Sequence, residues 1–168
     1  RIDEMTSSEV DALFLVNQDS VKTSYKVPTL AEVLALLKDK VYINVDKFWT
    51  DVEGIANEIR KAGVEKQVIV KTYVDEKSLE AVTKYAPDFM FMPLIWAKDT
   101  VTDKLLENGV NVIGAELLFD KEDCECIQDG YIKSMHDKGL MVWMNSIIYD
   151  ENAVISAHHT DDGSLSGN

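Results

Sequence analysis

The stretch "TLAEVLALLKDKVYINVDKFW" (residues 29–49) contains both elements from which an α/β domain is built. Thr29 and Glu32 form a T-x-x-E capping box, and leucine and valine residues recur after it at helical spacing, which predicts a helix. The short apolar run 41–45 then predicts a strand. Asp46 follows this strand directly, so a carboxylate stands where a buried strand ends.

The same alternation of strand and helix continues to residue 148. The strand runs are almost continuously apolar, which is typical of parallel strands with both faces buried. Thr50 and Glu53 offer a second capping box, and Gly63 a helix end. The predicted strands are 41–45, 67–73, 89–96, 110–119 and 140–148, and the predicted helices are 29–40, 49–63, 75–87, 98–109 and 121–139.

The two ends of the chain carry weaker patterns. Residues 5–15 predict a short helix capped by Thr6 or Ser7, and residues 16–28 a polar connection. The last twenty residues or so are polar and have no periodic core pattern. We therefore expect residues 1–168 to form a single α/β domain.

Two architectures fit this order of elements. About five parallel strands suit an open doubly wound sheet, whereas a complete (β/α)₈ TIM barrel takes roughly 250 residues and eight strands. The 168-residue chain is too short for a whole barrel, but it begins at Arg1 rather than Met and stops in a polar stretch. A partial (β/α)₈ barrel of about five strands fits the pattern equally well.

Composition excludes some classes of function. The net charge is −13 and no basic patch is present, which argues against a nucleic-acid partner. No apolar run is long enough to span a bilayer, and no signal peptide is visible, although the start at Arg1 leaves the compartment open. A phosphate-bearing substrate remains compatible, because a bound cation can reverse the local field.

The cysteines and histidines do not predict a metal site. Cys124 and Cys126 have one residue between them, which is poor spacing for zinc, and in a helix they point to different sides. We interpret both as structural. His136 has charged neighbours and is expected in solvent, and the adjacent His158 and His159 are poorly placed to bind one ion together.

Polar side chains stand at or near the carboxyl ends of four predicted strands, where active sites of parallel α/β proteins lie. They are Asp46, Lys71, Glu116 and Asn145. Burying such groups unpaired is costly, so we expect them to line one polar cavity. Each also has a simpler interpretation: Asp46 as a turn residue, Lys71 directed outward between helices, and Asn145 bonded to backbone. Glu116 is harder to dismiss, because it interrupts an apolar strand.

The chemistry of these groups suits a phosphoryl ligand. Carboxylate oxygens bind hard divalent cations such as Ca²⁺ and Mg²⁺. A cation and a lysine together can hold a phosphoryl group and stabilise the charge that develops on it.

Several stretches resemble the glycerophosphodiester phosphodiesterase family, in order over most of the chain. The segment "VPTLAEVLALLKDKVYINVDK" resembles the family's P-T-L-x-E-x-L followed by a strand of the type L-N-I-E-I-K. "RIDEMTSSEVDAL" is similar to the stretch before it, "VIVKTY" to a strand that usually ends in Ser-Phe, and "MVWMNSI" to a late strand that reads W-T-V-N.

The resemblance implies a (β/α)₈ barrel that hydrolyses glycerophosphodiesters to an alcohol and glycerol 3-phosphate with Ca²⁺ or Mg²⁺. Asp46 stands where the family has a metal-binding Glu that is longer by one methylene. Phe48 stands where the family has its lysine, so Lys71 is the candidate catalytic lysine. Asn145 matches the family's late-strand Asn, and we expect Asn145 and Glu116 to contact substrate.

Other family motifs have no counterpart in the chain. The H-R, E-x-D and H-D motifs, which include the catalytic histidine pair, would lie before Arg1, and T-D-x-P after Asn168. Two interpretations follow: a part of a longer catalytic domain, or a non-catalytic module that binds a small phosphorylated or polyol ligand. A phosphoacceptor domain is disfavoured, because Asp46 has no acidic partner. A partial barrel would have open edge strands, so we also expect self-association.

Overall fold

The computed structural model describes residues 2–97, 101–119 and 121–145. The helices are α1 (Ser7–Asp11), α2 (Leu30–Leu37), α3 (Val52–Ala62), α4 (Glu76–Tyr85), α5 (Val101–Glu107) and α6 (Asp129–Asp137). The strands are β1 (Phe14–Val16), β2 (Lys22–Lys26), β3 (Ile43–Val45), β4 (Val68–Val70), β5 (Met90–Phe91), β6 (Leu94–Ile95), β7 (Gly114–Leu118) and β8 (Met141–Asn145). Short 3₁₀ turns are η1 (Ile2–Glu4), η2 (Phe48–Thr50) and η3 (Glu125–Ile127).

Parallel strands form the body of the molecule, as the sequence predicted. One sheet has the order β3-β4-β5 and the next β6-β7-β8. The predicted strand 89–96 is divided into β5 and β6, because Pro93 has no N–H to donate to a ladder. Backbone bonds still join the two sheets: the Leu94 N–H donates to the Thr72 carbonyl over 2.9 Å, and the Ile113 N–H to the Phe91 carbonyl over 3.0 Å. The strands therefore follow one another side by side in chain order.

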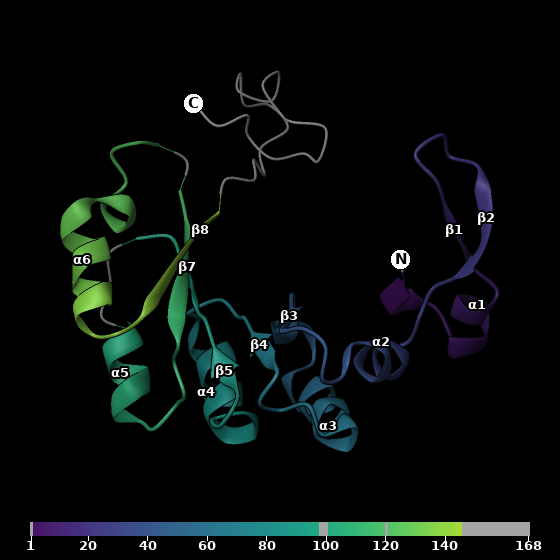
Figure 1. Cartoon of the computed structure of the whole chain (residues 1–168), viewed down its shortest axis with the longest axis horizontal. Coiled ribbons are helices and arrows are strands. Elements are labelled where there is room, and N and C mark those ends of the chain that lie inside the picture. Colours follow the sequence, from purple (N-terminus) through teal and green to yellow (C-terminus); the bar gives the residue numbers. More distant parts are fainter. Residues whose placement is uncertain (1, 98–100, 120, 146–168) are drawn as a thin grey trace.

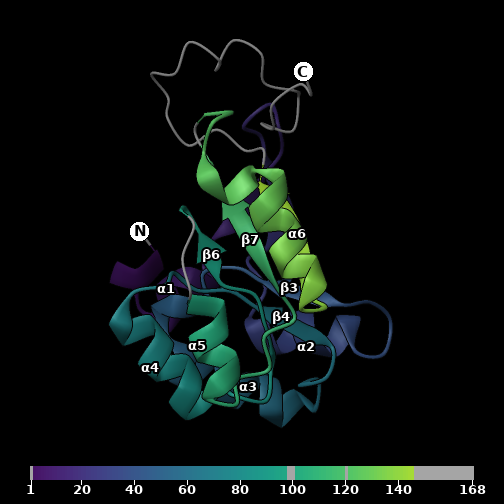
Figure 2. The same cartoon turned by 90° about the vertical axis from the view of Figure 1, so that its left-hand side faces the viewer.

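Helices α2 to α6 lie along one side of these strands, whereas α1 lies beside the β1–β2 hairpin (Figure 1). The contacts run from α2 to α3 and from α3 to α4, and α6 packs on β8. Figure 2 shows α3, α4 and α5 grouped together, with α6 against β7. The core lies between the strands and the helices, and its largest fully buried side chains include Leu34, Phe48, Ile59, Phe89, Phe91, Leu117 and Met135. No helix among the described residues is long and apolar enough to cross a membrane.

Helix α2 begins as its capping box predicts. The Thr29 N–H and hydroxyl both donate to Glu32 Oε2, over 2.8 and 2.9 Å. These bonds, the backbone one first, lower the pKa of the Glu32 carboxyl below its usual range. Because the pKa is depressed in the folded state, this stabilisation is complete above the ordinary carboxyl pKa. It is lost as pH falls through the folded value.

Three local predictions are wrong. Residues 16–28 are not a plain connection but include most of the antiparallel β1–β2 hairpin. The Asn17 side chain holds its turn by accepting from the Asp19 and Val21 N–H groups. The mostly exposed residues of β2 gave no apolar alternation to detect. Helix α3 is capped by Asp51 rather than Thr50, which lies in η2. The predicted helix 121–139 is η3 followed by α6, so both cysteines lie outside α6.

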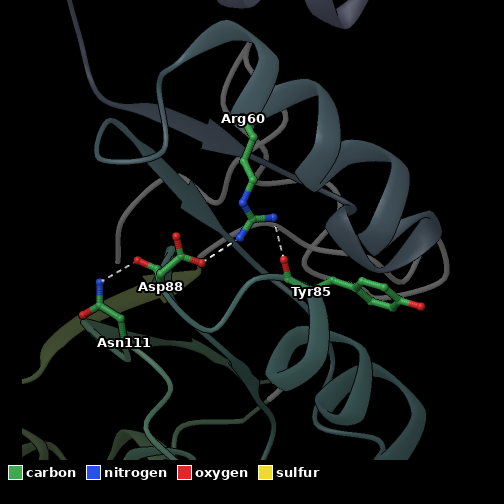
Figure 3. A network of polar contacts seen from close by, with 4 residues as sticks. All are labelled: Arg60, Tyr85, Asp88 and Asn111. Carbon is green, nitrogen blue, oxygen red and sulfur yellow. Dashed lines mark hydrogen bonds and ion pairs between the residues drawn. The ribbon is translucent and has the colours of Figure 1, made fainter.

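A polar network ties the amino-terminal ends of the strands together (Figure 3). Arg60 of α3 donates to the Tyr85 carbonyl over 2.7 Å and to Asp88 Oδ1 over 2.8 Å. Its guanidinium carbon lies 4.6 Å from the centroid of the buried Phe89 ring. The Asn111 side chain donates to the Asp88 carbonyl over 3.4 Å. This network joins α3, the end of α4 and the segment before β7, at the end of the sheet where stability rather than catalysis usually resides.

We predict that Arg60→Ala lowers the free energy of unfolding by about 1–2 kcal/mol, because it removes two hydrogen bonds and the ring contact of a partly exposed guanidinium. Urea unfolding followed by circular dichroism measures the change. The neighbouring Lys61→Ala is the matched control: Lys61 pairs with Glu58 in solvent, so its loss should cost less than about 0.5 kcal/mol. Equal effects of the two substitutions would contradict the role given to Arg60.

Candidate functional site

The structure brings together three of the four polar residues predicted at the strand ends. Lys71 follows β4, Glu116 lies in β7 and Asn145 ends β8. The Lys71 ammonium lies 2.5 Å from Glu116 Oε2, and the Asn145 side-chain NH₂ donates to Glu116 Oε1. The Lys71 and Glu116 side chains are only 3% and 8% exposed, so this is a buried ion pair rather than a surface contact. The outward orientation of Lys71 is thereby excluded.

Trp143 of β8 belongs to the same cluster, although its role was not predicted. The Lys71 ammonium lies 3.6 Å from the centroid of a Trp143 ring, which places the cation on the aromatic face. Trp143 is the register partner of Glu116, and it precedes Asn145 by two residues on the same face of β8. This period of two is the sequence signal that could have identified Trp143. Lys71, Glu116, Trp143 and Asn145 are called the Lys71 cluster below.

Lys71 and Glu116 come from β4 and β7, two strands that are not neighbours in the sheet. The β6 strand runs between β4 and β7, pairing with β7 directly and with the β4 side through the bridge from Tyr73 to Leu94. Lys71 and Glu116 therefore reach across the position of β6 to meet. Their opposite charges offset the cost of burial for each other, and the amide of Asn145 satisfies the second carboxylate oxygen. The result is a rigid group of ammonium, carboxylate and amide at the carboxyl ends of the strands.

Asp46 lies apart from these contacts. It is exposed, in the turn between β3 and η2, and the described contacts do not join it to the Lys71 cluster. Val45 of β3 and Val70 of β4 are register partners. Asp46 follows the first and Lys71 the second, so the backbones of Asp46 and Lys71 stand next to each other at the same edge. The simple interpretation of Asp46 as a turn residue thus describes its conformation, and its predicted metal-binding role stays a prediction.

The described residues do not make up a metal site by themselves. Within them, no group of three or more His, Cys, Asp or Glu side chains is placed to hold an ion. Both oxygens of Glu116 are engaged by Lys71 and Asn145. Asp46 can therefore supply one ligand at most together with groups from elsewhere. His158 and His159 lie outside the described residues.

Two further aromatic side chains contact each other near the carboxyl ends of β3 and β4. The rings of Trp49, in η2, and Tyr73, two residues after Lys71, have centroids 4.5 Å apart and an angle of 50° between their planes. Tyr73 remains 41% exposed. Two surface hollows lie elsewhere. One, of about 790 Å³, is at the amino-terminal ends of β3 and β4, and the other, of about 740 Å³, is between α4 and α5.

Comparison with known proteins supports the fold expected from the resemblance. The structure is similar to a crystal structure of a glycerophosphoryl diester phosphodiesterase from Parabacteroides distasonis, with a TM-score of 0.70 and 19% sequence identity. The match covers 94% of this chain and 54% of that one, so the chain spans about half the length of the similar protein. No protein-family model and no curated protein matches the chain. The likeness confirms the α/β fold class.

We predict that Lys71→Met lowers the free energy of unfolding by about 3–5 kcal/mol, because it leaves the Glu116 carboxylate buried without a counter-charge. Glu116→Leu should cost a similar amount, since it leaves the ammonium buried alone. The double variant should be much more stable than the sum of the two losses, within about 2 kcal/mol of the parent. Urea unfolding of all four proteins gives this double-mutant cycle, and additive losses would show that the two charges do not depend on each other.

Proposed function

We propose that the chain is part of a domain that hydrolyses glycerophosphodiesters to an alcohol and glycerol 3-phosphate with a divalent cation, Ca²⁺ or Mg²⁺. The observation that supports this most is the Lys71 cluster at the carboxyl ends of parallel strands. It lies in a fold similar to that of a glycerophosphoryl diester phosphodiesterase. In parallel α/β folds this end of the strands holds the catalytic groups.

The Lys71 cluster suits both halves of a glycerophosphoryl group. The Lys71 ammonium carries three N–H donors and can stabilise negative charge on phosphoryl oxygens. Each Glu116 oxygen keeps a second lone pair beside its present bond, and this lone pair can accept from a hydroxyl group of a glycerol moiety. Asn145, which bonds Glu116, holds the carboxylate in position for this contact. The Trp143 face and the Glu116 carboxylate also fix the ammonium in place, so that it needs little reorganisation when substrate binds.

The proposed cation would lie at the carboxyl edge of the sheet, near the Lys71 cluster. We assign Asp46 as one oxygen ligand, on the resemblance and on its place at the carboxyl edge. The remaining ligands, and the two histidines that act as acid and base in the family, have no counterpart in the 168 residues.

The proposal includes a partial (β/α)₈ barrel. The strand order β3, β4, β5 with β6, β7, β8 follows the chain, and helices lie on one side. Within the described residues, β3 and β8 each pair on one side only. On β8, Met141, Trp143 and Met144 are between 43% and 53% exposed. Such edges pair readily with further strands.

We therefore expect the 168-residue chain by itself to self-associate through these edges. Light scattering over a range of protein concentrations should show mass increasing with concentration. Met144→Lys, which places a charge on the β8 edge strand, should reduce the association. A monomer at the highest soluble concentration would contradict the expectation.

A binding module is the second candidate. The specific observation in its favour is that Lys71 is already neutralised by Glu116, so that its field toward an incoming phosphoryl group is weakened. In that case the Lys71 cluster would hold a small phosphorylated or polyol ligand without chemistry.

The deciding experiment is a panel of glycerophosphodiesters assayed for glycerol 3-phosphate release with Ca²⁺, Mg²⁺ or EDTA. The chain should be tested beside any longer protein that its gene encodes. We expect activity that EDTA abolishes. Asp46→Ala should reduce it by about tenfold to a hundredfold, as is typical when a residue that binds a metal or orients its ligands is lost. Glu65→Ala, which removes the same charge near the amino-terminal end of β4, is the matched control and should leave activity unchanged.

The other outcomes separate the two candidates. If no protein form releases glycerol 3-phosphate but calorimetry detects binding of glycerol 3-phosphate that Trp143→Leu weakens, the binding module replaces the enzyme. If neither turnover nor binding is detected with the fold intact, both candidates are wrong.

A further inference from the structure

The loop between β7 and α6 holds two thiols at close range. Cys124 and Cys126 are both unoxidised, and their sulfur atoms lie 3.1 Å apart. Cys124 is partly buried and Cys126 is fully buried. The expectation that they point to different sides is wrong, because Cys124 precedes the η3 turn and Cys126 lies inside it, so neither is in an α-helix. The pair is therefore a dithiol rather than two separate cysteines.

The rest of the loop holds this arrangement in place. The Gln128 side-chain NH₂ donates to the Glu122 carbonyl over 2.8 Å and to the Cys124 carbonyl over 3.2 Å, which closes the loop on itself. The Cys124 thiol donates to the Trp96 carbonyl over 3.5 Å, and the Cys126 thiol to the Leu118 carbonyl over 3.6 Å. Gln128 thus holds the loop backbone, and each thiol is bonded to a carbonyl at or just after the end of a strand.

We propose that Cys124 and Cys126 form a reversible dithiol–disulfide site whose oxidant is a small uncharged disulfide. A disulfide bond is about 2.05 Å long, so the two sulfurs need to approach by only about 1 Å, within one short loop. Cys124 is the more accessible sulfur and attacks first, and Cys126 resolves. The exposed Glu122, Asp123 and Glu125 surround the pair with negative charge, which disfavours anionic disulfides such as oxidised glutathione.

The exchange balances without any other reactant. The Cys124 thiolate, having lost its proton to solvent, attacks one sulfur of the small disulfide, whose S–S bond breaks and releases a first thiolate. The Cys126 thiolate then attacks Cys124 in the mixed disulfide and releases the second thiolate, and both leaving groups take up protons as thiols. The protein loses two hydrogen atoms, and the small disulfide is reduced to two thiols.

Oxidation changes contacts at the carboxyl ends of the strands. A disulfide has no S–H donor, so the hydrogen bonds to the Trp96 and Leu118 carbonyls are both lost. Trp96 follows β6, and Leu118 is two residues after Glu116 and is the register partner of Asn145. The redox state of the dithiol is therefore transmitted to the backbone that carries the Lys71 cluster. This inference does not depend on the proposed function.

The test is equilibration of the folded chain in buffers of 2-hydroxyethyl disulfide and 2-mercaptoethanol, followed by acid quench and mass spectrometry. We expect the chain to lose two hydrogens and to recover them on reduction. The equilibrium constant should be about tenfold or more larger in the folded chain than in urea, where the sulfurs are not held together. Because the 168 residues contain two cysteines, an intramolecular disulfide can join only this pair.

Two variants make the outcome unambiguous. Cys126→Ala should stop at a stable mixed disulfide on Cys124, because no second thiol resolves it. Cys124→Ser should leave the buried Cys126 unmodified in the folded chain. If the parent instead accumulates mixed disulfide, keeps both thiols in the most oxidising buffer, or has equal equilibrium constants folded and in urea, the proposal is wrong. Circular dichroism verifies that each protein is folded during the exchange.

Discussion

The buried ion pair between Lys71 and Glu116 is the constraint on which the carboxyl edge of this sheet depends. An ammonium and a carboxylate that are almost fully buried cannot exist there singly, because each requires the other's charge. The pair also joins β4 to β7 across the position of β6, so it fixes how these strands are placed. Trp143 contacts the ammonium and Asn145 bonds the carboxylate, so each charged group has a further partner from β8.

The two edges of the sheet use polar groups for different purposes. At the amino-terminal edge, Arg60 donates hydrogen bonds to the Tyr85 carbonyl and to Asp88, and its side chain is partly exposed to solvent. Such a network stabilises the packing of α3 on its neighbours. Its hydrogen-bond donors are already bonded within the fold rather than directed at a ligand. At the carboxyl edge, the charges are buried and arranged before any ligand arrives. Preorganised buried charge costs folding energy, which is one reason to propose a ligand site at this edge.

Much of this could be predicted from the sequence, and the reasons for the failures are physical. The capping box of Thr29 and the apolar runs are local signals, so α2 and the parallel strands followed from them. The meeting of Lys71, Glu116 and Asn145 followed from the rule that parallel strands end at one edge. The hairpin β1–β2 was missed because β2 is mostly exposed and has no apolar period, and Asp51 replaced Thr50 as cap because η2 takes Thr50 into its own turn. Trp143 was missed because partners across a sheet depend on register.

The charge balance of the Lys71 cluster has a consequence for what kind of ligand it can accept. A neutral pair exerts a weak field at a distance, so it would not attract a phosphoryl group strongly from solvent, least of all into a chain of net charge −13. An additional positive charge nearby would favour binding of an anion here. In the proposed site, a divalent cation held in part by Asp46, exposed at the same edge, would supply that charge. Electrostatics is thus a second argument for the proposed cation, beside the family resemblance. If the ligand were instead an uncharged polyol, the same neutral cluster would bind it without any metal.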